Sequence, residues 1–335
     1  MAEVSRATVD RVIHGRGTVS PKTYARIQRI LDKIDFQPNL IAQTLKKGEV
    51  YKVAILVPDY TRDVYWKRAF YGFDDALADY SFIGIRVDKY MFNLRKEVSF
   101  VLNARKILNG GYNGVVAAPV FYQESIDFFR SCEEMGLPYV TFNTHIKESQ
   151  ALCHVGQDLV QSGRTAASLL HRVCKPERRM LVLHMLEDHA NARHLKEKEE
   201  GFREFFRENG FSEDKVIVER IDNTLETEQR LMATLENQPS VGAIYVSTSK
   251  VHFVAEVLQA YDLDIRLLGY DLIDENTAYL EQGIIDYLIY QNPRFQANQA
   301  LSSLVDHLAF KKQLSKLKLL PIELVIKENL ENYMP

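Results

Sequence analysis

Residues 52–58, Lys-Val-Ala-Ile-Leu-Val-Pro, form an almost unbroken apolar run that ends at a proline. Such a run is typical of a strand buried on both faces, as in the parallel sheets of α/β proteins. It is the first of a series along the chain. Further strands are predicted at residues 82–87, 114–118, 138–142, 179–184, 216–220, 242–246, 265–269, 284–289 and 319–326.

Helical patterns fill the intervals between these strands, at residues 65–80, 94–108, 123–135, 159–173, 196–209, 227–237, 251–260, 274–281 and 293–310. Strands that alternate with helices of this length indicate βαβ units and parallel sheets. So many strands exceed one comfortable doubly wound sheet, so the sequence predicts an α/β body with two sheets. Ligands bind beyond the carboxyl ends of such strands, and two facing sheets would form a hinged cleft for a small molecule.

Charge is distributed unevenly along the 335 residues. The first fifty carry nine Lys and Arg against five Asp and Glu, whereas the remainder carries 33 against 40. A basic end on an acidic body is typical of a nucleic-acid-binding end. The sequence has no run of 18 apolar residues and no signal-peptide pattern, so we expect a cytoplasmic protein without a membrane partner.

Residue patterns for metal, cofactor or catalytic sites are missing. Cys132, Cys153 and Cys174 are widely spaced and form no CxxC pair, which favours buried, reduced thiols. His184, His189 and His194 recur every five residues, but that spacing belongs to a strand end and its loop, so we predict no metal site. The sequence lacks GxGxxG after a strand, GxxxxGK[ST], GxSxG and HExxH, and we therefore expect no cofactor and no enzyme.

The first fifty residues follow a different plan of short helices. A helix is expected over residues 5–14 with Ser5 as its N-cap, and a second over residues 21–34 with Ser20 as N-cap and Pro21 at the first helical position. Residues 35–38 break the second helix. Asn39 then caps a last short helix, which ends before the basic segment Lys46-Lys-Gly48.

This N-terminal segment, VSRATVDRVIHGRGTVSPKTYARIQRILDKIDFQPNLIAQTLKKG, resembles the headpiece of LacI/GalR (lactose-repressor) regulators. The family pattern is VSxxTVSRVLNG, then VSxxTRxRV, then the hinge motif YxPNxxAxxL. In the body, LLGYDLIDENTAYLEQGIIDYLIYQNP and LLPIELVIKEN are similar to further family motifs. The resemblance implies a helix-turn-helix headpiece at residues 1–50, with a hinge helix at 39–46, and a two-lobed periplasmic-binding-protein-like body at 51–335. Lobe one would comprise about 51–157 plus 293–319, and lobe two about 158–291 plus 320–335.

The resemblance further implies a homodimeric repressor that binds double-stranded operator DNA. A recognition helix places its N-terminal side chains in the major groove, where Arg6 can grip guanine and Ala7 can touch a thymine methyl group. Phosphate contacts are expected from Ser5, Thr8, Arg11, Thr18 and Lys22. In the hinge motif, which Asn39 and Ala42 match, Leu45 would wedge into the minor groove. The alternative for these polar residues is an ordinary exposed surface, and for Leu45 packing against the headpiece.

Two departures from the family pattern stand out. Family members carry a further helix before the VSxxTV motif, and here the chain opens at Met1-Ala-Glu-Val. We interpret this missing first helix as a start codon assigned too far downstream, the alternative being a poorly packed headpiece. Asp10 replaces the usual serine, and its carboxylate would lower the affinity for phosphates, read a cytosine, or turn toward Arg6 or His14.

The resemblance also implies a small carbohydrate-like effector bound between the lobes. Asp271 and Gln291, on the best-matched segment, are the strongest candidates, although Asp271 could instead cap the following helix. Lys198 stands where many members carry arginine, which leaves a sugar acid or sugar phosphate open. Tyr65 and Trp66 could be core residues instead. The predicted effector-binding residues are Tyr60, Tyr65, Trp66, Asn143, Arg193, Lys198, Thr248, Asp271 and Gln291. They come from a wider group of candidates beside the strands that also includes Asp59, Thr144, His189, Asn191 and Ser249.

Three rival functions remain open at this point. An enzyme would need a catalytic motif that we do not find. A sugar-binding protein without DNA function, exported or cytoplasmic, would share the two-lobed body but not the basic headpiece. A DNA-binding protein without a small-molecule response is the third possibility. The sequence does not identify the effector, the operator or the direction of the response.

Overall fold

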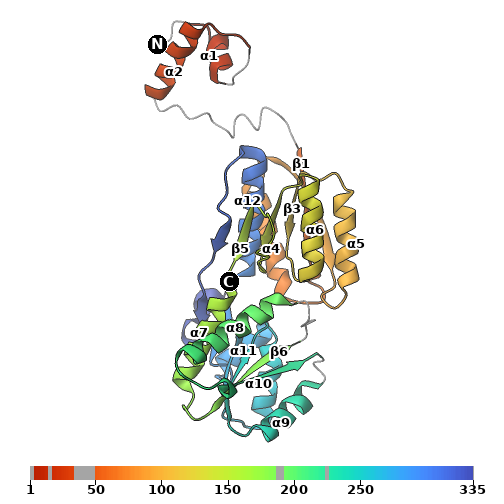
Figure 1. Ribbon diagram of the computed structural model, residues 1–335, viewed down its shortest axis with the longest axis vertical. Coiled ribbons are helices and arrows are strands. Elements are labelled where there is room, and N and C mark those ends of the chain that lie inside the picture. Colours follow the sequence, from red (N-terminus) through yellow and green to blue (C-terminus); the bar gives the residue numbers. More distant parts are fainter. Residues whose placement is uncertain (1–3, 14–16, 34–49, 186–191, 223–225, 335) are drawn as a thin grey trace. The chain divides into compact units, whose positions relative to one another are not determined.

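The computed structural model describes residues 4–13, 17–33, 50–185, 192–222 and 226–334. The chain divides into two compact units, Met1–Glu49 and Val50–Pro335. Figure 1 presents the ribbon of the chain. The predicted hinge helix at 39–46 lies outside the described residues.

The described residues of the first unit form two helices, α1 (Arg6–Ile13) and α2 (Pro21–Lys33). Both predicted N-caps are confirmed: the backbone N–H of Thr8 donates to Ser5 Oγ at 3.2 Å, and that of Thr23 to Ser20 Oγ at 3.3 Å. Each cap satisfies an N–H group that has no partner within its helix. Val12 and Ile27 are the buried apolar side chains among the described residues of this unit.

The second unit contains two sheets, and its described strands divide equally between them. The first sheet has the order β11-β5-β4-β3-β1-β2 and consists of β1 (Val50–Pro58), β2 (Gly84–Phe92), β3 (Gly114–Ala117), β4 (Tyr139–Phe142), β5 (Cys153–Gly156) and β11 (Leu317–Leu319). The second has the order β12-β10-β9-β8-β6-β7 and consists of β6 (Arg179–Met185), β7 (Val216–Ile221), β8 (Val241–Val246), β9 (Arg266–Tyr270), β10 (Tyr287–Tyr290) and β12 (Glu323–Val325). Neighbouring strands are parallel, except that β12 runs antiparallel to β10. The α/β prediction with two parallel sheets is confirmed.

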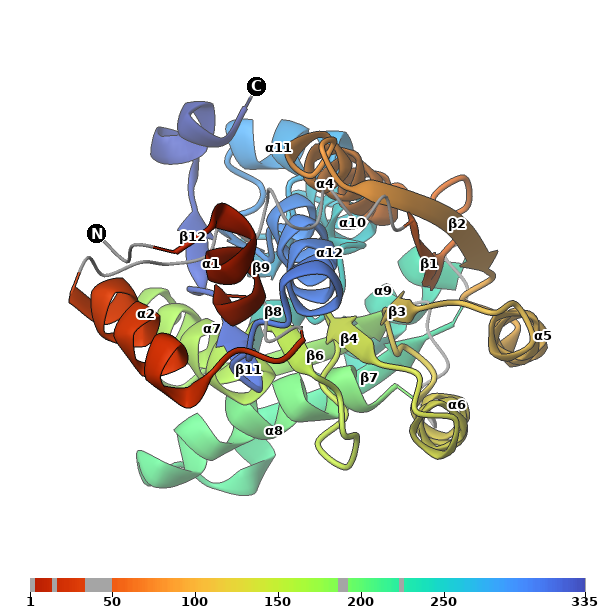
Figure 2. The same ribbon diagram turned by 90° about the horizontal axis from the view of Figure 1, so that it is seen from above.

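Helices cover both faces of each sheet. In Figure 2, α4 and α12 lie on one side of the first sheet and α5 and α6 on the other. On the second sheet, α7 and α8 pack in one apolar cluster, and α9, α10 and α11 in another on the opposite face. The helix bounds are α4 Tyr65–Asp79, α5 Glu97–Leu108, α6 Tyr122–Glu134, α7 Leu159–Val173, α8 Arg193–Glu208, α9 Thr227–Asn237, α10 Val251–Ala260, α11 Asp274–Glu281 and α12 Pro293–Phe310, with short 3₁₀ helices at Glu213–Lys215 and Lys327–Tyr333.

Three strand predictions were wrong in detail. The segment 319–326 is two strands, β11 and β12, which lie in different sheets on either side of Pro321. The short strand β5 was missed because Cys-His-Val-Gly offers no apolar run. Strand β2 extends from Gly84 to Phe92, well past the predicted end at Val87, because an edge strand tolerates charged residues such as Asp88 and Lys89.

Cys132, Cys153 and Cys174 are free and buried, as predicted. Among the helices of the described residues, none has the length and apolar character needed to cross a membrane.

One buried side chain ties together the three segments that connect the sheets. The chain crosses from the first sheet to the second after β5, returns between β10 and α12, and crosses again between β11 and β12. Gln157, in the first crossing, donates from Nε2 to the carbonyl of Tyr290 at 3.0 Å and to that of Pro321 at 2.8 Å. Its side chain therefore fixes the geometry of the connection between the two lobes, each built on one sheet.

The two hydrogen bonds of the Gln157 side chain predict a specific loss of stability when they are removed. Gln157→Met keeps the length of the side chain but removes both donors, which leaves two carbonyls in or near the interior without their partner. We expect the free energy of unfolding to fall by about 1–3 kcal/mol, measured by urea denaturation. Gln161→Met, at an exposed position of α7, should change it by less than about 0.5 kcal/mol. A Gln157→Met protein as stable as the unmodified chain would contradict this role of Gln157.

Candidate functional site

The predicted DNA-contacting residues that the structure describes lie on the surface of the first unit. Arg6, Ala7, Arg11, Thr18 and Lys22 are exposed, as expected of side chains available to a duplex. Ser5 and Thr8 bond each other through their hydroxyls at 2.9 Å while Ser5 caps α1. The remaining predicted contacts lie outside the described residues: Asn39, Ala42 and Leu45.

A small polar cavity lies between the two lobes, at the carboxyl ends of their strands. We call it the inner cavity, and its volume is about 50 Å³. Its walls come from the segments that follow β1, β2, β3 and β4 in one lobe, and β8, β9, β10 and the start of α8 in the other. The lining residues are Asp63, Tyr65, Trp66, Leu94, Val120, Asn143, His194, Lys198, Ser247, Thr248, Ser249, Asp271 and Gln291.

Seven of the nine predicted effector-binding residues line this inner cavity together: Tyr65, Trp66, Asn143, Lys198, Thr248, Asp271 and Gln291. Asp63, Leu94, Val120, His194 and Ser247 also line the cavity but were not predicted from the sequence, whereas Ser249, from the wider group of candidates, lines it too. Position after a strand was an available signal for most of them, but it selects many residues that face elsewhere. Convergence of these segments depends on how the two sheets face each other, which local periodicity does not encode.

Asp271 is the best-anchored acceptor of the inner cavity. It follows β9 in the left-handed region, with φ of 68°, and its carboxylate accepts from the backbone N–H of Gln291 at 3.1 Å and from Gln291 Nε2 at 2.8 Å. Burial raises the pKa of Asp271 to about 6, against the opposing effects of Gln291 and the Lys198 charge. The capping interpretation was wrong, because the N-cap of α11 is Ile273.

Lys198 supplies a buried cation to the same cavity. Its Nζ donates to the carbonyl of Ser247 at 2.9 Å and lies 3.6 Å from the centre of the Tyr270 ring. Its position depends on close packing of α7 and α8, since a Cβ on Gly163 would lie 2.0 Å from the Lys198 carbonyl oxygen. Glycine is therefore required at that crossing.

The first lobe contributes a paired tyrosine and amide. Asn143, which follows β4 with φ of 70°, donates from Nδ2 to the Tyr65 hydroxyl at 2.7 Å. Burial raises the pKa of Tyr65 well above its usual value, so this phenol stays protonated. Trp66 packs edge-on against Tyr65 and Phe142 and is 4% exposed, so it is a core residue that also borders the cavity.

Two predicted residues lie outside the inner cavity. Tyr60 packs its ring edge-on against Phe70, with 4.6 Å between ring centres. Arg193, at the start of α8, donates to the Tyr122 hydroxyl at 2.6 Å and to the Glu148 carboxylate at 3.0 Å, both in the other lobe. The structure therefore gives Arg193 a lobe-to-lobe contact.

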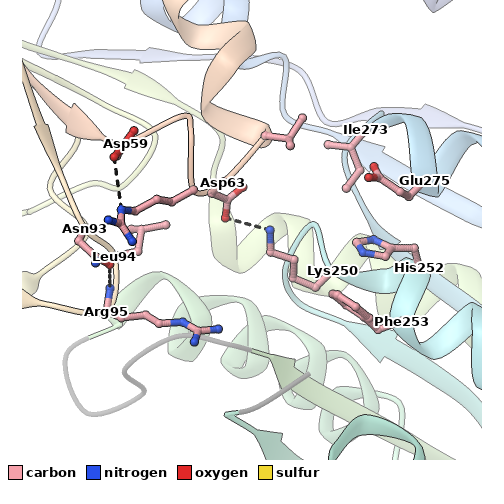
Figure 3. A pocket seen from close by; sticks show the side chains of 12 residues that line it. Asp59, Asp63, Asn93, Leu94, Arg95, Lys250, His252, Phe253, Ile273 and Glu275 are labelled. Carbon is pink, nitrogen blue, oxygen red and sulfur yellow. Dashed lines mark hydrogen bonds and ion pairs between the residues drawn. The ribbon is translucent and has the colours of Figure 1, made fainter. Parts of the chain in front are cut away.

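Outside the inner cavity lies a larger depression, which we call the outer groove, with a volume of about 470 Å³ (Figure 3). Asp63 and Leu94 line both spaces, so the two are adjacent. Lys250 Nζ lies 3.0 Å from the Asp63 carboxylate and joins the lobes at this boundary. The groove is lined by Asp59, Arg62, Asp63, Val64, Asn93, Leu94, Arg95, Lys250, His252, Phe253, Ile273 and Glu275.

The histidines considered for metal binding have other surroundings. His184 Nδ1 lies 2.7 Å from Ser247 Oγ, and Nε2 lies 2.9 Å from the Glu199 carboxylate. This contact holds the pKa of Glu199 at about 2. His189 is outside the described residues, and His194 borders the inner cavity. Within the described part of the chain, no three His, Cys, Asp or Glu side chains are grouped to hold a metal ion.

Known families match both units. The family of bacterial regulatory proteins of the lacI type matches residues 1–39, and the periplasmic binding protein domain matches residues 53–312. A solved structure from Bacteroides fragilis, assigned as a LacI transcriptional regulator, is similar with a TM-score of 0.80 and 27% identity. That similarity covers 85% of this chain and 100% of the other.

Curated relatives agree with these families. The regulator pepR1 of Lactobacillus delbrueckii is 31% identical over 115 residues, which is 34% of this chain and 33% of the relative. The ribose operon repressor of Halalkalibacterium halodurans is 20% identical over 278 residues, which is 81% of this chain and 77% of the relative. Matches to the first relatives span only a quarter to a third of those proteins' length. The chain therefore belongs to the periplasmic binding protein domain family, in the form in which a lacI-type regulatory headpiece precedes the domain.

Proposed function

We propose that this protein is a DNA-binding transcription regulator, a repressor, whose operator affinity is controlled by a small carbohydrate-like effector between its lobes. The observation that carries the proposal is that one chain joins a lacI-type headpiece to a body with a polar cleft. It acts in the cytoplasm, where operator DNA is found, and it binds its effector without converting it.

The headpiece supports the DNA half of the proposal. Capped α1 presents Arg6, Ala7 and Arg11 on an exposed surface near its start and end. Arginine can grip guanine bidentately in the major groove, and polar neighbours set the register through phosphates. A sugar-binding protein without DNA function would have no use for this headpiece.

The cleft supports the effector half. Hydroxyl recognition requires several fixed donors and acceptors, because an unpaired polar group in a closed site is costly. Asp271, Gln291, Asn143 and Lys198 meet this requirement, since each is held by a hydrogen bond of its own. The name of the ribose operon repressor, similar over most of this chain, is consistent with a carbohydrate ligand.

Regulation follows from coupling the two units. As a homodimer, the protein would present two headpieces to a pseudo-palindromic operator, because two-fold protein symmetry requires two-fold DNA symmetry. An effector that favours one lobe arrangement shifts the headpieces between DNA-binding and released states. Coupling energies of this kind are typically about 1–3 kcal/mol.

The DNA half predicts that Arg6→Ala removes sequence preference. Loss of a bidentate guanine contact should lower the ratio of specific to non-specific affinity by about tenfold or more. The measurement is fluorescence anisotropy at fixed salt, on a duplex selected from a random pool by the unmodified chain and on an unrelated duplex. Arg130→Ala, which removes an exposed arginine of the body, is the charge-matched control. An unchanged ratio for Arg6→Ala would rule out its assigned role.

The effector half predicts a pH dependence through Asp271. With a pKa of about 6 in the folded protein, its carboxylate becomes protonated as the pH falls from 7 to 5 and loses its capacity to accept two hydroxyls. Affinity for the neutral sugar that binds best at pH 7 should fall by about tenfold over this range, measured by calorimetry. Asp271→Asn should bind weakly and without this dependence.

The same pKa shift affects stability with the opposite sign. The folded pKa lies above the unfolded value, so the folded protein binds more protons, and this group's contribution to stability rises as the pH falls from about 6 towards 4.

The control for the binding prediction is Asp127→Asn, at an exposed site. It should leave both the affinity for the sugar and the pH dependence of that affinity unchanged. Sugar binding that is equally tight at pH 5 and pH 7 would contradict the role of Asp271.

A further inference from the structure

The effector's size and charge can be inferred from the adjacent inner cavity and outer groove. We infer that the effector is a neutral disaccharide or longer oligosaccharide, whose second sugar unit lies in the outer groove and donates a hydroxyl hydrogen bond to His252. This inference rests on the proposed function and deepens it, because it names the class of ligand.

The volumes of the inner cavity and the outer groove indicate a ligand that is larger than the inner cavity alone. About 50 Å³ in the inner cavity has room for a few water molecules or for one edge of a sugar ring with its hydroxyls. Sites for small molecules usually enclose about 300–1,000 Å³, which the inner cavity alone does not approach. The outer groove adds about 470 Å³ and shares Asp63 and Leu94 with the cavity. A ligand anchored at Asp271 and larger than the inner cavity would therefore extend past these two residues into the outer groove.

The charges of the outer groove indicate a neutral ligand. Three carboxylates and three cations line it, and two of the pairs are joined: Arg62 lies 3.4 Å from Asp59, and Lys250 lies 3.0 Å from Asp63. An anionic group would meet the carboxylates of Asp59 and Glu275 as well as the arginines. Balanced charges offer a neutral polyol many donors and acceptors.

Apolar side chains complete a carbohydrate-like surface. Leu94, Phe253 and Ile273 lie among the charged groups of the groove (Figure 3). Sugar rings combine hydroxyl edges with faces of C–H groups, so they bind where fixed polar groups alternate with apolar ones. Both kinds of surface are present in the outer groove, and they come from both lobes.

His252 is oriented as an acceptor by a buried asparagine. Asn276 donates from Nδ2 to the carbonyls of Ser249, Tyr270 and Asp271, which fixes its amide so that Oδ1 faces His252. His252 Nδ1 lies 3.0 Å from that oxygen and must carry the proton. The neutral imidazole then presents the lone pair of Nε2, and burial lowers the pKa of His252, which keeps the ring neutral.

The same asparagine links the inner cavity and the outer groove. It holds the backbone of Ser249 and Asp271, which line the inner cavity, and the ring of His252, which lines the outer groove. The acceptors for the two ends of a disaccharide are therefore held at a fixed spacing before the ligand arrives. Such preorganisation reduces the entropy lost on binding.

The test uses the full chain and its single tryptophan. Trp66 borders the inner cavity, so its fluorescence reports on ligand binding there. The probes are cellobiose, maltose, lactose and melibiose, with glucose and galactose as their constituents. We expect at least one disaccharide to bind ten times more tightly, or better, than either of its constituent monosaccharides.

A pair of variants tests the outer groove. His252→Phe keeps the bulk of the ring but removes the hydrogen-bond acceptor. It should lower the affinity for that disaccharide about tenfold and leave the affinity for its constituent monosaccharides unchanged. His307→Phe, on α12 in the other lobe, is the matched control. If His252→Phe folds poorly, Arg95→Ala, on the exposed rim of the outer groove, provides a second test. It should lower the affinity for the disaccharide by a smaller factor and leave the affinity for the monosaccharides unchanged.

Two results would overturn the inference: a monosaccharide that binds as tightly as its disaccharide, or no binding by any of the four disaccharides. A monosaccharide that binds as tightly as its disaccharide and changes operator affinity would contradict the disaccharide inference but support the proposed function. If operator affinity responds to no sugar of either size, the effector half of the proposed function fails as well.

Discussion

The amide of Gln157 holds together the three chain segments on which the two-lobed body depends. Two sheets of similar construction have no covalent connection other than these crossings, and their relative orientation decides which residues meet between them. Gln157 bonds the carbonyls of Tyr290 and Pro321, one from each of the other crossings. Backbone groups that leave a sheet near the interior need partners, and here one side chain supplies two of them.

The cleft follows from this connection and from strand direction. Because the strands on both sides of the cleft end toward it, the segments after β1, β4, β8, β9 and β10 supply its walls. Asn143 and Asp271 still donate their backbone N–H groups to the neighbouring strands, at Val155 and Ile289, and the chain turns there through left-handed conformations. Their side chains then turn inward, and each is bonded within its own lobe before any ligand is present.

Contacts between the lobes surround the cleft. Lys250 pairs with Asp63 at the boundary of the outer groove, Arg193 reaches Tyr122 and Glu148, and Arg68 donates to the carbonyl of Leu272 at 2.7 Å. Each of these bonds joins one lobe to the other, so separation of the lobes must break them. Polar, partly exposed pairs of this kind contribute little individually, and they therefore allow closure without locking it.

Local sequence determined the elements and many of the polar residues beside the cleft. Apolar runs specified buried strands, Ser5 and Ser20 specified helix starts, and Asp271 and Gln291 were identifiable because they follow strands in a segment similar to a known family. Tertiary structure alone decided the rest. It divided one predicted strand into β11 and β12, turned Arg193 toward the opposite lobe, and placed Asn276 against His252, 24 residues away in the chain. Periodicity records which face of an element is buried, but not which distant element it meets, and that pairing is fixed by packing over the whole body.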